Sequence, residues 1–344
     1  MQPCQKKHMS SFPVSSSILS TISIANYIQQ QYNFSTAESC KLIKAGINHT
    51  YELTHLSGKY IFRVYSFNWR SKPEINEELK LVNHLRENGI PVSYPISDKN
   101  GDIIQELPAP EGNRFAVLFS YAQGEKLLNY SLETHEKVGE VMARIHQITL
   151  NYTLKRIAYN EDSLLIHPFP ELRNFLPENS EEMAFMTSLQ QQLLIEIRAA
   201  DPATLRNGAV HLDIWFDNLN VNSNGEITIF DFDFCGNGWL CLDIAYYLMQ
   251  LQVIEINEER YIAKLQSFLK GYESVTTINN EERKLLHTLG LSLYFFYLGV
   301  QCQRFENWSN VFLNETYLKR YIDARVKKYA EYSYFKTLIQ SDRI

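Results

Sequence analysis

The chain has 344 residues, a formal net charge of −6 and a hydrophobic share of 45%. A chain of this length allows about two lobes, each with enough apolar residues to bury its own core. The negative charge argues against a nucleic-acid-binding protein, because such proteins need a basic surface to displace counterions from phosphates, and it favours a cationic partner over an anionic one.

The cysteines and the longest apolar run exclude several other classes of protein. The five cysteines are odd in number and form no CxxC pair, so they indicate neither a zinc site nor a disulfide framework. The longest apolar run, residues 289–300, is shorter than the roughly 18 residues of a membrane span. We therefore expect reduced thiols, no membrane partner and a cytoplasmic location.

The first 120 residues predict a disordered arm followed by a small lobe rich in strands. Residues 1–17 are polar and low in complexity, which is typical of an arm outside the core. The lobe, residues 18–120, begins with an expected helix at about 20–31 and three expected strands within 40–65. Its other expected elements are a helix at 74–88 and strands at 103–107 and 114–120.

The rest of the chain predicts a larger, mostly helical lobe. Residues 121–124 (YAQG) have the composition of a turn and are expected to form a hinge. Residues 125–344 are expected to be mostly helical, apart from one hairpin at 219–230. The predicted class is therefore α+β, with a small antiparallel sheet lobe that carries one key helix and a large α-helical lobe.

A short motif in the large lobe carries the first chemical signal. Residues 210–218, VHLDIWFDN, contain His-x-Asp-x-x-x-x-Asn, the spacing of a kinase catalytic loop. In such a loop Asp213 would accept or orient the proton of an attacking hydroxyl, and Asn218 would reach a metal ion. Since such a match arises by chance on the order of a few per cent of the time, Asp213 could also be an ordinary polar loop residue.

The following residues favour the catalytic interpretation. Two short β-like runs, 219–221 and 226–230, are joined by a turn that contains Asn224-Gly225, a strong hairpin signal. A hairpin would bring Asp231 beside Asn218, and two oxygen ligands from separate strands suit a hard cation that bridges phosphates. Asp231 also follows an apolar strand, where an unpaired carboxylate is costly.

The small lobe should hold the nucleotide. Kinase-type sites place a basic residue on the third strand, at the phosphates, and pair it with a glutamate on the next helix. Arg63 is the only cation in residues 60–65. On the next helix Glu78 lies inside the apolar stripe, whereas Glu77 is expected to point away, so Glu78 is the expected partner. The alternative for Arg63 is a solvated strand cation.

Over residues 40–248 these segments resemble the phosphotransferase enzyme family, which includes aminoglycoside phosphotransferases, choline kinases, type II homoserine kinases and stress response kinase A. The resemblance is carried by GINHTYEL, EELKLVNHLRENGIPV, VGEVMARIHQ, HLDIWFDN and FDFDFCGNGWLCLDIAYYL. It implies a protein-kinase-like two-lobed fold that uses ATP and Mg²⁺. It also implies that Asp213 is the catalytic base, that Asn218 and Asp231 bind the metal, and that Asp243 is structural.

The resemblance also locates the nucleotide contacts. It implies that the Ser120 carbonyl and the Ala122 amide meet the adenine, and that a loop with Asn48 but no GxGxxG pattern lies at the phosphates. Arg63 stands where many relatives have lysine, which bears on nucleotide affinity. The pattern at residues 231–238, DFDFCGNG, is most similar to the branch of stress response kinase A and type II homoserine kinases.

Three functions follow from these observations. The leading one is an ATP-dependent kinase that phosphorylates a hydroxyl of a small molecule, such as an aminoglycoside or an amino alcohol, with a cationic acceptor favoured by the acidic balance. The second is a Ser/Thr protein kinase like stress response kinase A, for which the partner would be a protein substrate. The third is a nucleotide-binding pseudokinase regulator, against which the intact polar residues of the motif argue.

Overall fold

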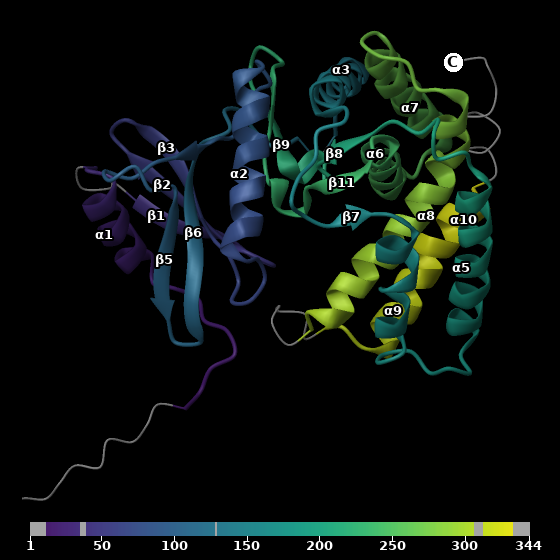
Figure 1. Ribbon diagram of the computed structural model, residues 1–344, viewed down its shortest axis with the longest axis horizontal. Helices are drawn as coiled ribbons and strands as arrows, with labels where there is room; N and C mark the ends of the chain where they lie inside the picture. The colour runs from purple at the N-terminus through teal and green to yellow at the C-terminus, as the bar shows by residue number, and fades with distance from the viewer. Residues whose placement is uncertain (1–11, 35–38, 128, 306–311, 333–344) are drawn as a thin grey trace, which may run out of the picture. The chain divides into compact units, whose positions relative to one another are not determined.

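The computed structural model describes residues 12–34, 39–127, 129–305 and 312–332 (Figure 1). Contacts divide the chain into two units. Unit 1 comprises Met1–Ser71 and Ile96–Leu118, and unit 2 comprises Lys72–Pro95 and Phe119–Ile344. Residues 1–11 of the predicted arm lie outside the described residues.

Unit 1 is built on an antiparallel sheet, as the alternating apolar runs predict. The strand order is β1-β2-β3-β6-β4, and β5 pairs with β6. The strands are β1 (Ser39–Ala45), β2 (His49–His55), β3 (Gly58–Val64), β4 (Pro95–Ile96), β5 (Ile104–Ala109) and β6 (Gly112–Ser120). Helix α1 (Thr21–Gln31) begins after Ser20, whose side chain accepts the Ser23 N–H, and it buries Ile24 and Ile28 in the core of this unit.

A buried arginine joins distant segments of unit 1. The side chain of Arg114 is 1% exposed; its Nε donates to the Tyr65 carbonyl at 2.8 Å and its Nη1 to the Ser17 carbonyl at 2.9 Å. Nη1 also lies 3.5 Å from the carboxylate of Glu111, which accepts a hydrogen bond from the Ser17 hydroxyl. Ser17, the last residue of the predicted arm, is thus anchored to the folded unit.

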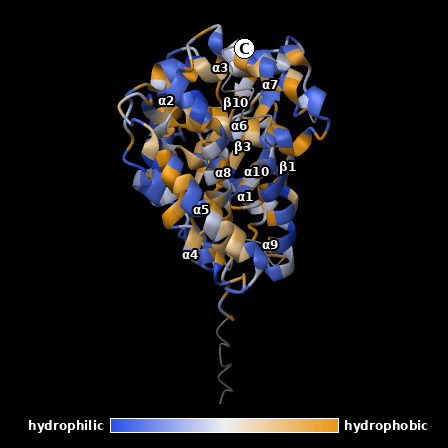
Figure 2. Ribbon diagram, turned by 90° about the vertical axis from the view of Figure 1, so that its right-hand side faces the viewer, coloured by the Kyte–Doolittle hydropathy of each residue, from blue (hydrophilic) through white to orange (hydrophobic). Residues whose placement is uncertain are grey.

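Unit 2 contains α2 (Lys72–Glu87), although the predicted small lobe, residues 18–120, includes that helix. The expected apolar stripe of α2 is buried, and the helix contacts the short 3₁₀ segment Phe232–Phe234, which belongs to unit 2. The other helices are α3 (Leu132–Thr149), α4 (Phe169–Leu172), α5 (Glu181–Ala199), α6 (Cys241–Ile254), α7 (Glu258–Glu273), α8 (Asn280–Gln303), α9 (Glu315–Tyr321) and α10 (Lys328–Glu331). Polar and apolar residues share α5, as an amphipathic helix requires (Figure 2).

Helix α8 forms the centre of unit 2. It contacts α4, α5 and α6, and it runs beside α5 and α6 in Figure 1. By length and composition it could cross a membrane, yet 83% of its most apolar stretch is buried inside the fold, as in the core helix of a globular protein. An Asn279–Glu282 capping box fixes its start.

Two small sheets complete unit 2. The expected hairpin is present as β9 (Leu219–Val221) and β10 (Ile227–Ile229), which pair antiparallel. The prediction missed a second sheet, in which β11 (Gly236–Trp239) lies between β7 (Ala158–Tyr159) and β8 (Asn207–Val210). The glycines in these strands weaken the sequence signal for a strand. At Gly208 glycine is required for a steric reason, because a Cβ there would lie 2.0 Å from the Thr149 carbonyl oxygen.

Candidate active site

The predicted catalytic loop follows β8 and is held in an uncommon backbone conformation. Leu212, next to Asp213, has φ of 65°, a left-handed value that is rare for a residue with a branched side chain. The Asp243 carboxylate at the start of α6 accepts the N–H groups of His211 at 3.0 Å and of Leu212 at 2.6 Å. Asp243, which sequence reasoning reads as structural, therefore fixes the loop on which Asp213 lies.

Both carboxylate oxygens of Asp213 have partners within unit 2. The Asn218 amide nitrogen donates to Oδ2 at 2.6 Å and also to the Asp213 carbonyl at 3.0 Å. The Tyr246 hydroxyl on α6 donates to Oδ1 in a short hydrogen bond. Because its nitrogen is committed to Asp213, the Asn218 side chain has its oxygen left as the group that a cation could use.

A neutral histidine links the catalytic loop to the hairpin. The Asp213 N–H donates to His211 Nδ1 at 3.1 Å, and His211 Nε2 lies 3.2 Å from the Phe230 carbonyl. Burial lowers the pKa of His211, although Asp243 and Asp231 oppose the shift. A neutral ring with Nδ1 as acceptor and Nε2–H as donor satisfies both contacts.

The hairpin brings the two predicted metal ligands to adjacent positions. Strand β10 pairs with β9 through Ile229 and Leu219, and one step further the Phe230 N–H donates to the Asn218 carbonyl at 3.0 Å. Asp231 follows with φ of 66°, a second left-handed residue. The register thus places Asp231 next to Asn218, as the Asn-Gly turn predicts.

The donor chemistry of this pair fits Mg²⁺ bound together with phosphates. Asn218 and Asp231 offer oxygen atoms, which hard cations prefer. Within the described ranges no group of three or more His, Cys, Asp or Glu side chains could hold a metal ion. Asn218 and Asp231 could hold a metal whose remaining ligands come from a nucleotide and water, which is how Mg²⁺ usually binds in kinases.

Glu78 has a buried partner that the sequence did not reveal. The side chains of Glu78 and Arg156 are each 1% exposed, and Arg156 Nη1 lies 3.8 Å from the Glu78 carboxylate. Arg156 Nη2 donates to the Asp233 carbonyl at 2.5 Å, and Nη1 lies 3.4 Å from Cys235 Sγ. Burial alone would lower the pKa of Arg156, but Cys235, Glu78 and Asp233 raise it above its ordinary value. Arg156 thus joins α2 to the segment that follows Asp231.

Glu77 is less exposed than predicted. It is 8% exposed, and its carboxylate accepts the Lys155 N–H at 2.8 Å and lies 2.6 Å from Lys80 Nζ. The Lys155 hydrogen bond, followed by the one from Lys80, lowers the pKa of Glu77. The Lys80 side chain is 64% exposed, however, so this ion pair lies at the surface, unlike that of Glu78.

The predicted adenine-binding residues belong to unit 2. The Ser120 carbonyl already accepts a hydrogen bond from the Ser93 hydroxyl at 2.5 Å, so an adenine amino group would donate to the second lone pair of that carbonyl. The Ala122 N–H donates to no residue in the part of the chain that the structure describes. The Ala122 carbonyl accepts the Asn220 amide at 2.6 Å, which ties the hinge to β9. At Gly124, with φ of 102°, a Cβ would lie 2.3 Å from the Val221 carbonyl oxygen.

The predicted phosphate-binding residues belong to unit 1. Arg63 is 7% exposed, and its guanidinium lies 5.7 Å from the centre of the Tyr65 ring, so Arg63 is not the solvated strand cation of the alternative interpretation. Asn48 Oδ1 accepts the Ser66 N–H at 3.4 Å, and the Asn48 carbonyl accepts the Gly46 N–H at 3.2 Å. The Asn48 loop is therefore closed by its own backbone and by the end of β3.

Comparison with known proteins identifies the family. The model of the phosphotransferase enzyme family matches residues 39–276. The chain belongs to this family. A homoserine kinase from Methylobacillus glycogenes is 28% identical over 241 residues, which cover 70% of this chain and 72% of the relative.

Solved structures show the same fold. An amicoumacin kinase, hAmiN, in complex with AMP-PNP, Ca²⁺ and Ami superposes with a TM-score of 0.72 at 21% identity, covering 93% of this chain and 92% of that one. A microcompartment-associated aminopropanol kinase gives a TM-score of 0.67 at 20% identity, covering 89% and 98%. The predicted kinase-like α+β fold is confirmed. Kinases of this family phosphorylate hydroxyl groups of small molecules, so the chain is a small-molecule kinase.

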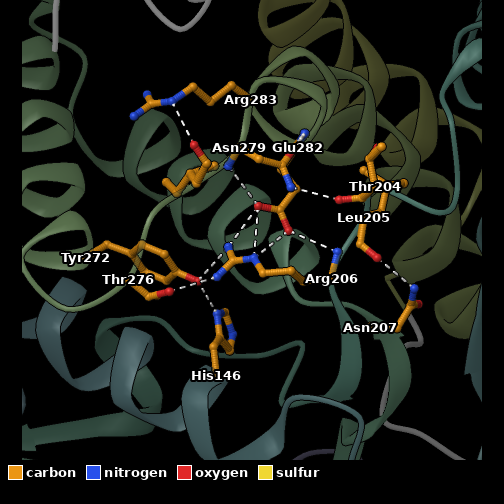
Figure 3. Close-up of polar contacts among 11 residues, drawn as sticks. His146, Thr204, Leu205, Arg206, Asn207, Tyr272, Thr276, Asn279, Glu282 and Arg283 are labelled. Atoms are coloured by element: carbon orange, nitrogen blue, oxygen red, sulfur yellow. Dashed lines mark hydrogen bonds and ion pairs between the residues drawn. The ribbon is translucent and has the colours of Figure 1, made fainter.

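In this member of the family a buried polar network continues from the catalytic loop into the helical core. His146 Nε2 lies 3.2 Å from Asp243 Oδ2, and His146 Nδ1 lies 2.7 Å from the Tyr272 hydroxyl. Arg206 Nη2 donates to Tyr272 at 3.2 Å and pairs with the fully buried Glu282 (Figure 3). The network links Asp243, which supports the catalytic loop, to Glu282 in the capping box of α8. Its hydrogen bonds satisfy polar groups whose burial would otherwise be costly.

Proposed function

We propose that the protein transfers the γ-phosphoryl group of ATP, bound with Mg²⁺, to a hydroxyl of a small amine-bearing acceptor. The observation that carries this proposal is the arrangement of Asp213, Asn218 and Asp231 on one loop and hairpin. The relatives act on homoserine, amicoumacin and aminopropanol, of which homoserine and aminopropanol carry both an amine and a hydroxyl. The acidic balance of the chain suits a cationic acceptor.

In the proposed reaction Asp213 is the base. An Asp213 oxygen takes the proton as the acceptor O–H bond breaks, and the electron pair of the hydroxyl oxygen forms a bond to the γ-phosphorus. The bond between that phosphorus and the β,γ-bridging oxygen breaks, and ADP leaves with the electron pair. Asp213 then releases its proton to solvent.

The remaining residues orient the reactants. Mg²⁺, when bound, neutralises the charge on the β- and γ-phosphates. Asn218 and Asp231 would hold it, and Asn218 also fixes the Asp213 carboxylate. The Ala122 N–H and the second lone pair of the Ser120 carbonyl would orient the adenine, whereas Arg63 and the Asn48 loop would meet the phosphates. Glu78 supports this arrangement through its buried ion pair with Arg156.

The test is phosphoryl transfer by wild type and Asp213→Asn to L-homoserine, 1-amino-2-propanol, an aminoglycoside and a generic protein substrate. We expect transfer to at least one small acceptor and a loss of kcat of about 10³-fold or more in Asp213→Asn, with nucleotide affinity within a few-fold. The matched control is Asp217→Asn on the same loop, whose carboxylate pairs with the partly exposed Lys126.

Other outcomes would replace the proposal. Transfer only to the protein substrate would indicate a protein kinase, and nucleotide binding without any turnover would indicate a pseudokinase. An Asp213→Asn variant with the wild-type rate would show that Asp213 is not the base. We also propose a cytoplasmic location, where ATP is present and buried thiols such as those of Cys241 and Cys302 stay reduced. Cell fractionation would test it.

A further inference from the structure

Two tyrosines from different helices contact consecutive residues of the catalytic loop. Tyr246 on α6 donates its hydroxyl hydrogen to Asp213 Oδ1. Tyr297 on α8 donates to the Leu212 carbonyl at 2.5 Å, and the two rings lie 5.4 Å apart at 41°. The Leu212 N–H donates to Asp243, so both the N–H and the carbonyl of Leu212, the residue with the left-handed backbone, are held by hydrogen bonds. The loop is therefore anchored at its backbone and at its reactive side chain.

Tyr246 is fixed in its role as donor. It is 3% exposed, and burial, followed by the charge of Asp213, raises the pKa of Tyr246 well above its ordinary value. Contacts with Gln250 and Tyr297 oppose this rise without cancelling it. The phenol thus stays protonated at neutral pH, and its hydrogen is directed to Asp213.

The contact with Tyr246 has a geometric consequence for Asp213. The terminal torsion of an aspartate is broad and roughly two-fold, so a carboxylate with one partner can rotate. Here the Asn218 amide donates a hydrogen bond to one oxygen at 2.6 Å and the Tyr246 hydroxyl donates to the other, and the two bonds fix the plane of the carboxylate. A carboxylate oxygen has two lone pairs, so one that accepts such a hydrogen bond can also accept a proton.

We propose that Tyr246 is a positioning residue for phosphoryl transfer: its hydroxyl fixes the Asp213 carboxylate in the orientation that presents a lone pair to the acceptor hydroxyl. This inference rests on the proposed function of Asp213 as the base. Tyr246 acts through Asp213, does not touch the nucleotide and exchanges no proton in the reaction. Its loss should therefore lower kcat and leave the KM for ATP unchanged.

The test is steady-state kinetics of Tyr246→Phe, which removes one oxygen atom and keeps the ring. With 1-amino-2-propanol or L-homoserine as acceptor, or with basal ATP hydrolysis if neither is accepted, we expect kcat to fall at least tenfold and the KM for ATP to stay within twofold. The matched control is Tyr247→Phe, the next residue on α6, because its buried hydroxyl lies 2.7 Å from His135 Nδ1 and makes no contact with the loop. Its kcat should stay within twofold of wild type.

A double-mutant cycle separates positioning from a general structural effect. If Tyr246 acts through the carboxylate, Tyr246→Phe should cost less than twofold in an Asp213→Asn background, whereas a structural defect would cost the same in both backgrounds. Equal losses, or an unchanged kcat for Tyr246→Phe beside an impaired Asp213→Asn, would overturn this inference alone. A wild-type rate for Asp213→Asn, or no turnover of ATP by wild type, would overturn the proposed function and this inference with it.

Discussion

The two units use buried polar groups for different purposes. In unit 1 the buried Arg114 joins the ends of strands and Ser17, and its partners are backbone carbonyls, Glu111 and His49, none of which is a predicted site residue. In unit 2 the buried carboxylate of Asp243 and the hydroxyl of Tyr246 bond directly to the catalytic loop. The difference indicates that a buried polar group stabilises the fold in unit 1, whereas in unit 2 it also sets the geometry of the residues that we propose for catalysis.

The largest expected effect tests this comparison in unit 1. Arg114→Met should lower the free energy of unfolding by about 3–5 kcal/mol, since it leaves Glu111, with a side chain 2% exposed, without its ion pair. The kcat of the folded fraction should stay unchanged. Urea denaturation and activity per folded molecule provide the measurements.

The control for Arg114 lies in the same sheet. Lys59, whose side chain is 46% exposed, pairs with Glu52, and Lys59→Met should cost less than about 0.5 kcal/mol. A fall in kcat for Arg114→Met without loss of stability would contradict the comparison.

The second effect concerns the metal ligands of unit 2. Asp231→Ala and Asn218→Ala should each weaken Mg²⁺-dependent nucleotide binding by about 10- to 100-fold, because each removes one of the two protein oxygens proposed for the cation. Titration calorimetry with AMP-PNP, with and without Mg²⁺, measures it. Asn222→Ala, at the exposed turn of the same hairpin, is the control. Unchanged metal dependence in both variants would remove Asn218 and Asp231 from the metal site.

The third effect distinguishes two neighbouring glutamates of α2, Glu77 and Glu78. Glu78→Ala should lower kcat or raise the KM for ATP by at least tenfold, or about 1.4 kcal/mol, because it removes the buried carboxylate that pairs with Arg156. Glu77→Ala should change either constant by less than threefold, since its pair with Lys80 lies at the surface. Steady-state kinetics of both variants measures these changes in kcat and in the KM for ATP. If Glu77→Ala is the more damaging change, the assignment of the functional glutamate is wrong.

These variants also mark the limit of prediction from sequence. The hairpin and the apolar stripe of α2 follow from spacings of a few residues, so local patterns are enough to predict them. The contact between Tyr246 and Asp213 joins residues 33 apart, and that between Arg156 and Asp233 spans 77. Their partners depend on how helices pack, and no local periodicity encodes that. Tyr246 reads in the sequence as one more apolar position of a buried helix.

The smallest expected effect is a pH dependence of stability, to which one buried histidine in each unit contributes. Burial, assisted by Arg114, lowers the pKa of His49 in unit 1 to about 4, and burial, assisted by Lys264, lowers the pKa of His135 in unit 2 to about 4. The unfolded chain, with ordinary histidine pKa values near 6.5, therefore binds protons that the folded chain does not. Stability should fall as the pH drops from about 6.5 towards 4, and this contribution should level off below 4.

Urea denaturation at pH 7 and pH 5.5 measures this effect. Each histidine should account for about 1 kcal/mol of the loss. His49→Gln and His135→Gln should each reduce the difference between the two pH values. If both buried variants retain the full wild-type difference, other groups cause the pH dependence.

The late position of α8 has a consequence for synthesis of the chain. Helix α6, with most of its side chains buried, packs against α8, which ends at Gln303. A growing chain therefore carries its complete catalytic loop and hairpin, residues 211–231, for many residues before the helix that covers α6 has left the ribosome. During that interval an apolar surface is open to solvent and to other nascent chains. The loop and hairpin are complete before the apolar surface of α6 is covered, so premature termination between α6 and α8 should yield aggregating products.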